Sequence, residues 1–325
     1  MKVVTIGGGT GAPIVIKALI EAGVKDITAI CAAMDSGGKT GIIRSDERDR
    51  VIAISDLLRN LLTMIPKNHS AFAEMLNFVD GRNRNLGYTI YYALLEKYHN
   101  NFLAVQQHFE HLLGIKFLGQ VIPVSLEPTN IKFQTESGEI WIGEHELDRQ
   151  AMSANSISKM WIEPAVKTTP EAQVAIEKAD VLVFAPGSLY GSVLVNFLPL
   201  GIKEALAKSK AQKILITNLT SNRNQTHDFT PLSYWQILKK YTGLAKPFNL
   251  MIVPDLSRPE FEKKYPKIAS AYAREHAHFL GWEEKDFQNL GIQVIRKDIM
   301  AITPDLSRLR HDPNKLSKVF KSLWN

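Results

Sequence analysis

The stretch Val3-Val4-Thr5-Ile6-Gly7-Gly8-Gly9-Thr10-Gly11-Ala12 decides the fold class. Its first four residues are apolar or β-branched and predict a short buried strand, and the glycines that follow predict a tight turn. Residues 12–22 then carry apolar side chains at helical spacing, and a second apolar run follows at 27–33. This order is typical of a βαβ unit, so we expect a parallel sheet.

The remainder of the chain continues the alternation of helices and strands. Apolar periodicity predicts helices over 51–65, 85–98 and 102–113. Short apolar runs predict further strands, each separated from the next by a helical stretch, at 181–184, 214–217, 250–253 and 292–295. The expected fold is therefore α/β: a Rossmann-like, mostly parallel sheet with helices on both faces.

A different pattern appears between the two halves of this alternation. Strand-like runs occur at 121–124, 131–135, 139–142 and 160–162, and Ser137-Gly138 predicts a hairpin turn. We expect a single domain over 1–325, with a helical segment at about 66–115 and a β-rich insertion at about 120–165. No internal repeat or low-complexity segment divides the chain.

Composition limits the class of protein. The 325 residues are 45% hydrophobic and 22% charged, which are ordinary globular values and exclude disorder of the whole chain. Cys31 is the only cysteine, so an internal disulfide and a cysteine-based zinc site are excluded, and a reducing, cytoplasmic location is expected. The uncharged run 181–202 is interrupted by Pro186, Gly187 and Pro199, so we expect no membrane span.

The net charge of +6 is spread along the chain without a run of like charges. This distribution favours a small anionic ligand over nucleic acid, for which a clustered basic stripe is expected. A soluble basic surface without any ligand explains the charge equally well.

The first glycine loop is expected to bind phosphate through Gly8, Gly9, Thr10 and Gly11. Missing side chains let backbone N–H groups approach an anion, and the start of the following helix attracts negative charge. A tight turn that binds nothing is the structural alternative. Gly7, Gly9 and Ala12 also fit the G-x-G-x-x-A dinucleotide pattern, so an NAD(P)-dependent oxidoreductase is a further alternative.

A second polar, glycine-containing segment follows the second strand, at 35–41. Ser36, Gly37 and Gly38 are candidates for phosphate binding. Asp35 lies between two loops that would attract phosphate, where a carboxylate suits Mg²⁺ or a ligand hydroxyl; a turn-forming Asp is the structural alternative. Arg44 suits a bridge between phosphate oxygens or, equally, a solvated surface position.

Two more groups of residues are candidates for the same cleft. Gly187, Ser188 and Leu189 lie in a third glycine loop after the strand at 181–184, and Asn218 follows the strand at 214–217. The carboxyl ends of parallel strands meet at one edge of a sheet, so these loops should converge. A polar stripe at helical spacing, formed by Asp56, Arg59 and Asn60, either faces this cleft or lies on the surface.

Taken together, the motifs resemble the CofD-like superfamily, and within it the YvcK-type gluconeogenesis factors. The resemblance covers nearly the whole chain and rests on GGGTG at 7–11, DSGGKTG at 35–41 with Arg44, DLLRN at 56–60, ADVLVFAPGSLYGSVLVNF at 179–197, KILITNL at 213–219 and LRHDPNK at 309–315.

The resemblance implies a diphosphate-linked nucleotide ligand. In the YvcK branch this ligand is a UDP-sugar such as UDP-N-acetylglucosamine, and the biology is cell-wall supply and cell shape on gluconeogenic carbon sources. The related 2-phospho-L-lactate transferases move a phospholactyl group from a guanosine diphosphate carrier to a deazaflavin acceptor, using Mg²⁺. By position, Asp35 matches the acceptor side, Gly187 and Ser188 match the nucleotide loop, and Tyr272 and Arg310 match residues associated with the sugar nucleotide.

The chain departs from the family pattern mainly on the acceptor side. Asp35-Ser36 replaces two adjacent acids, the run 53–56 reads AISD where the family has PPGD, and both 84–88 and 220–226 are altered. The sequence therefore predicts binding of a nucleoside-diphosphate compound, with group transfer as the alternative. Mg²⁺ is the expected metal and no tightly bound organic cofactor is expected; a homodimer and a regulatory protein partner are both compatible with the sequence.

Overall fold

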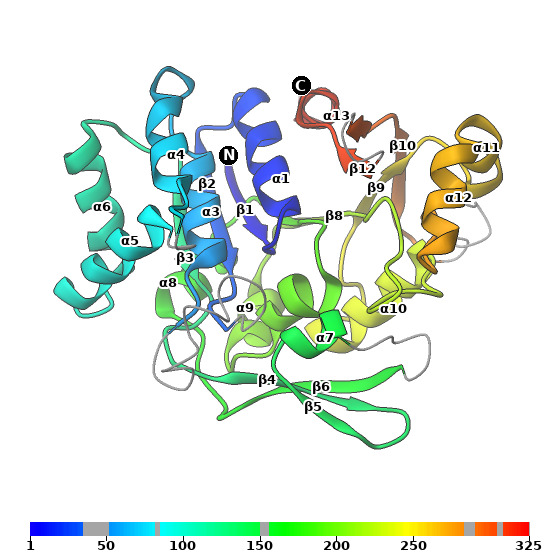
Figure 1. Cartoon of the computed structure of the whole chain (residues 1–325), viewed down its shortest axis with the longest axis horizontal. Helices are drawn as coiled ribbons and strands as arrows, with labels where there is room; N and C mark the ends of the chain where they lie inside the picture. The colour runs from blue at the N-terminus through cyan, green and yellow to red at the C-terminus, as the bar shows by residue number, and fades with distance from the viewer. Residues whose placement is uncertain (35–51, 82–84, 150–155, 283–289, 304–307, 325) are drawn as a thin grey trace.

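The central sheet has seven strands among the residues that the computed structural model describes, which are 1–34, 52–81, 85–149, 156–282, 290–303 and 308–324. All neighbouring strands run parallel. In spatial order they are β10 (Gln293–Lys297), β9 (Leu250–Pro254), β8 (Gln212–Ile216), β7 (Val181–Phe184), β1 (Lys2–Ile6), β2 (Asp26–Cys31) and β3 (Gln120–Pro123) (Figure 1).

The strands form because their apolar side chains are buried on both faces. Every residue of β7 is buried, and its side chains alternate between two separate cores: Val181 and Val183 on one face, Leu182 and Phe184 on the other. Such continuous apolar runs are typical of a parallel sheet covered on both sides.

Helices cover both faces, as the sequence predicts. One core contains side chains from α1 (Gly11–Glu21), α3 (Ser55–Thr63) and α13 (Pro313–Trp324). The other contains side chains from α8 (Pro170–Glu177), α9 (Ile202–Lys208) and α10 (Pro231–Thr242). The α/β, Rossmann-like fold class is therefore confirmed.

The helical segment lies beside β3 and consists of α4 (Ser70–Asn77), α5 (Leu86–Lys97) and α6 (Phe102–Leu113) (Figure 1). Asn85 and Asn101 precede α5 and α6, and each accepts a hydrogen bond from a backbone N–H of the first turn. These asparagine caps satisfy donors that have no partner within the helix, and they explain where the two helices begin.

The β-rich part of the chain divides into two sheets. The run at 121–124, which the sequence groups with the insertion, instead pairs with β2 as the edge strand of the main sheet. The smaller sheet is antiparallel, in the order β5 (Ile140–Ile142), β4 (Asn130–Thr135), β6 (Ile157–Glu163). Along the chain α7 (His145–Arg149) comes between β5 and β6, and in Figure 1 it is drawn between the small sheet and the main sheet. The difference arises because a short apolar run does not show which strand it will pair with.

The C-terminal region adds α11 (Arg258–Lys264), α12 (Pro266–Arg274) and a two-stranded hairpin of β11 (Met300–Thr303) and β12 (Arg308–His311). The last helix, α13, packs along α1. None of the helices described is both long and apolar enough to cross a bilayer.

The order of the strands fixes where a ligand can bind. β1 and β7 are neighbours in the sheet. After β1 the chain continues to β2, on the side of β1 away from β7, whereas after β7 it continues to β8, on the side of β7 away from β1. The loops after β1 and β7 therefore diverge and leave a crevice between the carboxyl ends of these two strands. This end of the sheet points towards the small sheet (Figure 1).

Candidate functional site

A polar cavity of about 340 Å³ lies at this crevice. Three parts of the chain that are far apart in sequence form it: the start of α1, the loop after β7 and the loop after β8, with β12 and Glu144 completing the wall. The lining residues are Thr10, Gly11, Ile14, Glu144, Pro186, Gly187, Ser188, Leu189, Asn218, Leu219, Thr220, Ser221, Asn222, Gln225, Thr226, Leu309, Arg310 and His311. The structure thus brings together Thr10 and Gly11 of the first glycine loop, the third glycine loop, Asn218 and Arg310, whereas Gly8 and Gly9 do not line this cavity; their role in binding stays a prediction.

The loop of residues 7–11, which we call the β1 loop, is fixed by close packing. A Cβ on Gly8 would lie 1.9 Å from Oδ2 of Asp56, and a Cβ on Gly11 would lie 1.9 Å from the carbonyl oxygen of Pro186. Gly9 has a φ of +65°, which disfavours a side chain. These glycines are therefore required by the packing, whatever the loop binds.

A carboxylate of the protein already occupies part of the β1 loop. The Gly9 N–H donates to Asp56 Oδ2 at 2.8 Å, and Arg59 Nη1 donates to Asp56 Oδ1 at 2.5 Å. The remaining donors of this region lie at the start of α1, where the side chain of Thr10 makes no cap and both Thr10 and Gly11 line the cavity. An anion in the cavity would therefore meet the first turn of α1, where backbone donors lack helical partners.

The loop of residues 186–192, which we call the β7 loop, is held by two amide side chains. Asn218 pairs with the backbone of Gly187, accepting from its N–H at 3.1 Å and donating to its carbonyl at 2.8 Å. Oε1 of Gln225 accepts from Ser188 Oγ at 2.9 Å and from the Tyr190 N–H at 3.2 Å. Both amides come from the segment after β8, so this segment sets the shape of the β7 loop.

The strand β12 contributes a cation and a neutral imidazole. Arg310 is exposed and lines the cavity, where its guanidinium can face an anion. His311 is buried, and its Nε2 lies 2.9 Å from the Thr217 carbonyl. Burial lowers the pKa of His311 from its ordinary 6.5 to about 4, so the ring is neutral at pH 7 and Nε2 carries the proton that the carbonyl accepts.

Tyr272 lies behind β12 rather than in the cavity wall formed by the described residues. Its ring is 6% exposed, and its hydroxyl accepts a hydrogen bond from the Leu309 N–H at 2.9 Å. The guanidinium of Arg308 lies 5.4 Å from the ring centroid and pairs with Glu275 at 2.5 Å. In this arrangement Tyr272 positions the strand that presents Arg310.

The three polar residues predicted to form a stripe on α3, Asp56, Arg59 and Asn60, do not all face the cavity at the strand ends. Asp56 points to the β1 loop, whereas Arg59 lines a separate groove. Asn60 is 1% exposed; its amide faces the thiol of Cys31 and makes no hydrogen bond that meets the usual geometry with any described residue. Its neighbour Cys31 is also fully buried, and burial together with the charge of Asp56 raises the pKa of that thiol, so Cys31 stays protonated.

The second predicted loop lies outside the described residues. This applies to Asp35, Ser36, Gly37, Gly38 and Arg44. Within the described part of the chain, no three His, Cys, Asp or Glu side chains come together in a group that could hold a metal ion. Binding of Mg²⁺ at Asp35 thus stays a prediction from the sequence, and no step of chemistry is derived through it.

Several cavity residues could not be chosen from the sequence. Glu144 comes from the β-rich insertion and packs so closely on Gly191 that a Cβ there would lie 1.9 Å from its carboxylate. Nothing in the local pattern around Glu144 predicts this approach, because the insertion folds back over a loop nearly fifty residues later. Gln225 and His311 lie within segments that the sequence analysis does single out, at 220–226 and 309–315, but only the structure shows what they contact.

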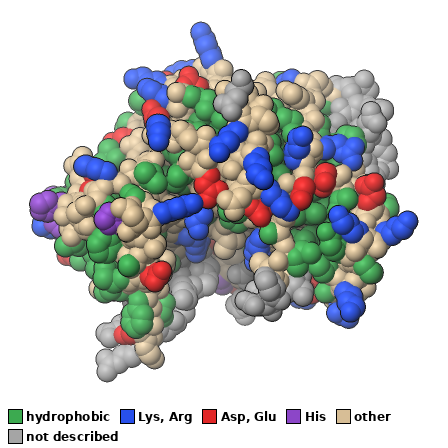
Figure 2. Space-filling view, turned by 90° about the horizontal axis from the view of Figure 1, so that it is seen from above, with side chains coloured by type: hydrophobic (Ala, Val, Ile, Leu, Met, Phe, Trp, Pro, Cys, Tyr) green, Lys and Arg blue, Asp and Glu red, His purple; other side chains and the backbone are tan. Residues whose placement is uncertain are grey.

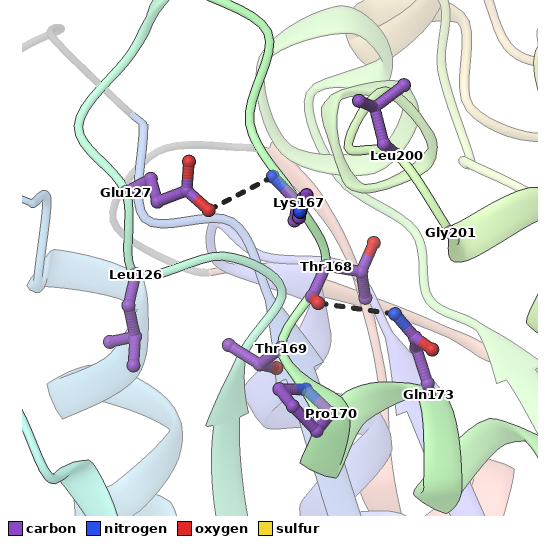
Figure 3. A pocket seen from close by; sticks show the side chains of 9 residues that line it. All are labelled: Leu126, Glu127, Lys167, Thr168, Thr169, Pro170, Gln173, Leu200 and Gly201. Atoms are coloured by element: carbon purple, nitrogen blue, oxygen red, sulfur yellow. Dashed lines mark hydrogen bonds between the residues drawn. The ribbon is translucent and has the colours of Figure 1, made fainter.

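A second hollow, of about 570 Å³, lies between the β3–β4 connection and the start of α8 (Figure 3). Here Glu127 accepts from the Lys167 N–H at 3.3 Å, and Gln173 donates to the Thr168 carbonyl at 3.3 Å. Neither of the two glycine loops that the structure describes reaches this hollow, and its wall includes Leu126 and Leu200. The segments directly after β1, β7 and β8 line the first cavity but do not line this hollow among the described residues.

The surface carries charges of both signs. Figure 2 shows Lys and Arg side chains interspersed with Asp and Glu over the face seen from above in Figure 1. On this face no long single-sign stripe is visible among the described residues.

Comparison with known proteins places these features in a family. The model of the family described as 2-phospho-L-lactate transferase CofD matches residues 3–300. A protein of Listeria innocua named gluconeogenesis factor is 29% identical over 327 residues, covering 97% of this chain and 93% of its own length. The gluconeogenesis factor of Bacillus subtilis is 26% identical, covering 99% and 98%. The crystal structure of a UPF0052 family protein from Bacillus halodurans superposes with a TM-score of 0.85 at 25% identity, over 98% of both chains.

Proposed function

Since this chain belongs to the CofD family, we propose that it binds a nucleoside-diphosphate compound, a UDP-sugar such as UDP-N-acetylglucosamine, in the cavity between α1 and the loops after β7 and β8. The observation that carries the proposal is the meeting of Gly11 and Gly187 at the point where the strand order reverses. In open α/β sheets ligands bind at this position, outside the carboxyl ends of the strands.

The chemistry of the cavity wall suits a diphosphate with polar groups attached. The first turn of α1 offers backbone donors and a favourable dipole, and Arg310 offers a delocalised cation that matches phosphate oxygens. The hydroxyl of Thr220 and the second N–H of the Asn218 amide, beyond the one donated to Gly187, offer partners for base and sugar groups. Few apolar side chains line this space, which disfavours a lipid or another fully apolar ligand.

The relatives named gluconeogenesis factors support a regulatory role for this binding. In this proposal the chain supports cell-wall supply and cell shape during growth on gluconeogenic carbon sources. Ligand occupancy would act by favouring one conformation of the loops over another, which requires different affinities for the two conformations.

Calorimetry with UDP-N-acetylglucosamine tests the binding. We expect saturable heat with the sugar nucleotide and weaker binding of UDP alone, while NAD serves as the control for the dinucleotide pattern at Gly7, Gly9 and Ala12. Arg310→Ala should weaken binding by about tenfold, the loss of a charged hydrogen-bond donor. Gln173→Ala, in the hollow of Figure 3, is the matched control. The absence of heat at millimolar UDP-N-acetylglucosamine from folded protein would overturn the proposal, and so would equal binding by the Arg310 variant.

Group transfer is a second candidate, supported by the description of the matching family as a transferase. The phosphoanhydride bond of the donor would break, the phospho-group would pass to an acceptor hydroxyl that loses its proton, and a nucleoside monophosphate would leave while positive groups at the cavity stabilise its charge; Asp35 would orient the acceptor. Asp35→Asn should then abolish turnover of a nucleoside-diphosphate-linked donor while leaving donor binding intact. Turnover at the parental rate would contradict the role of Asp35.

A further inference from the structure

A separate groove of about 470 Å³ lies between α1, α3 and α4. Its described walls share no residue with the cavity at the strand ends. The apolar part includes Ile20 from α1, Leu62 from α3 and Leu118, whose side chain is 37% exposed although it is large and apolar. The groove is within the size range of small-molecule sites and offers apolar surface to a ligand.

Charged groups of both signs border this apolar surface. Lys17 lines the groove and forms no ion pair with any described residue. Arg59 uses Nη1 for Asp56, and its side chain is 40% exposed, so its other N–H groups can face the groove. The cations are thus only partly matched by the protein.

Glu21 supplies the opposite charge, and its carboxylate is incompletely satisfied. Oε1 lies 3.3 Å from Nζ of Lys67, an ammonium group on a side chain that is 87% exposed. Oε2 is buried and has no hydrogen-bond donor among the described residues. Buried polar atoms are nearly always hydrogen-bonded, so this carboxylate is incompletely satisfied, and rotation of the side chain, which is 21% exposed, would present the oxygen to a donor in the groove.

We propose that this groove binds a small zwitterion with apolar side chains, the chemical class of short apolar peptides. The ammonium group would donate to Glu21, the carboxylate would face Lys17 and Arg59, and the side chains would cover Ile20, Leu62 and Leu118. A simple fatty anion fits less well, because it brings no donor to Glu21 and adds a like charge beside it.

The groove is connected to the β1 loop through a single side chain. Arg59 binds Asp56, and Asp56 accepts from the Gly9 N–H. A ligand carboxylate bound to Arg59 would weaken the ion pair between Arg59 and Asp56. Because Asp56 also holds the Gly9 N–H, occupancy of the groove is coupled to the conformation of the β1 loop. Such coupling is reciprocal, but groove binding itself does not depend on what the loop binds.

Calorimetry with L-leucyl-L-leucine on the full chain tests the proposal. We expect saturable binding, and losses of about tenfold or more with the N-acetylated dipeptide, which lacks the ammonium group, and with the dipeptide amide, which lacks the carboxylate. The variant Glu21→Gln should remove the preference for a free ammonium group. These chemical controls also distinguish a zwitterion site from an apolar surface that binds any hydrophobic compound.

A matched pair of variants on α4 locates the site. Ala73 lines the groove, whereas Ala71 is exposed on the same helix outside the groove. Ala73→Trp should abolish dipeptide binding and Ala71→Trp should preserve it, with circular dichroism showing that both fold. The proposal is overturned if no heat develops up to about 10 mM dipeptide, if the N-acetylated dipeptide binds equally, or if folded Ala73→Trp binds like the parent.

Discussion

The two glycine loops on either side of the cavity are held in place by different interactions. In the β1 loop, the backbone at Gly8 and Gly11 packs directly on Asp56 and Pro186, so that no Cβ fits. In the β7 loop, Gly187 has more space, and amide side chains from the segment after β8 hold the backbone. The β1 loop therefore depends on missing side-chain atoms at Gly8 and Gly11, whereas the β7 loop depends at Gly187 on hydrogen bonds that another segment supplies and only at Gly191 on a missing side chain, beside Glu144.

The largest loss of stability is expected from a substitution that disrupts the packing of the β1 loop. Gly11→Ala places a Cβ against the carbonyl of Pro186, which is backbone and cannot rotate away. We expect the free energy of unfolding to fall by about 3 kcal/mol, despite the better helix propensity of Ala. Urea denaturation measures this change. Gly81→Ala is the matched control, because a Cβ there meets nothing within 4 Å. If Gly11→Ala lowered the free energy of unfolding no more than Gly81→Ala does, the backbone of the β1 loop would be able to shift and accommodate the added Cβ.

The second prediction concerns how stability changes with pH. It tests whether the hydrogen bonds that hold the β7 loop through Asn218 depend in turn on His311. His311 holds the Thr217 carbonyl, next to Asn218, and its folded pKa of about 4 lies below its ordinary 6.5. Between these values the unfolded chain binds the proton more readily than the folded chain, so stability is complete above pH 6.5 and is lost as the pH falls. From pH 7 to pH 5 the loss should be about 2 kcal/mol.

The variant His311→Gln separates this contribution from other titrations. A Gln amide can still donate to the Thr217 carbonyl but carries no titratable group, so the dependence between pH 7 and pH 5 should be roughly halved or less. His278, whose pKa is also lowered mainly by burial, retains a contribution of the same sign in both proteins. An unchanged pH profile in the variant would show that His311 is not the group responsible.

A slightly smaller loss is expected when the amide support of the β7 loop is removed. Asn218→Ala leaves the N–H and the carbonyl of Gly187 without their side-chain partners, in a half-buried position. We expect a loss of about 1.5 kcal/mol in the free energy of unfolding and weaker binding of UDP-N-acetylglucosamine. Thermal unfolding and calorimetry measure the two effects. Unchanged ligand affinity together with lower stability would separate the β7 loop from the binding site.

The same difference explains what the sequence could predict. The β1 loop has a local signature, since four glycines between a strand and a helix indicate a close approach of backbone, and the parallel order of β1, α1 and β2 follows from the same stretch. The convergence of Gly11, Gly187 and Asn218 also follows, because the carboxyl ends of parallel strands share one edge.

The contacts that complete the site have no such signature. Glu144 and Gln225 reach the β7 loop across long sequence separations, and which strand β3 pairs with depends on tertiary packing. Tyr272 and Arg310 entered the prediction only through the family resemblance, which does not distinguish a residue that lines the cavity from one that supports the strand behind it. The structure separates the two, since Arg310 is exposed at the cavity and Tyr272 is buried.

The smallest change in free energy is expected from a substitution of Asp56, whose carboxylate accepts a hydrogen bond from the backbone of the β1 loop. Asp56→Asn keeps an oxygen for the Gly9 N–H but removes a negative charge near the proposed diphosphate and releases Arg59 from its ion pair. Reduced repulsion on the order of 1 kcal/mol should tighten UDP-N-acetylglucosamine by about fivefold. Calorimetry at two salt concentrations measures this gain, which should shrink at high salt because the charges are then screened. Glu74→Gln, an exposed acid on α4, is the control for net charge and should change little. Tighter binding would mean that Asp56 stands in for the anion when the cavity is empty, whereas clearly weaker binding would mean that its carboxylate serves the ligand directly.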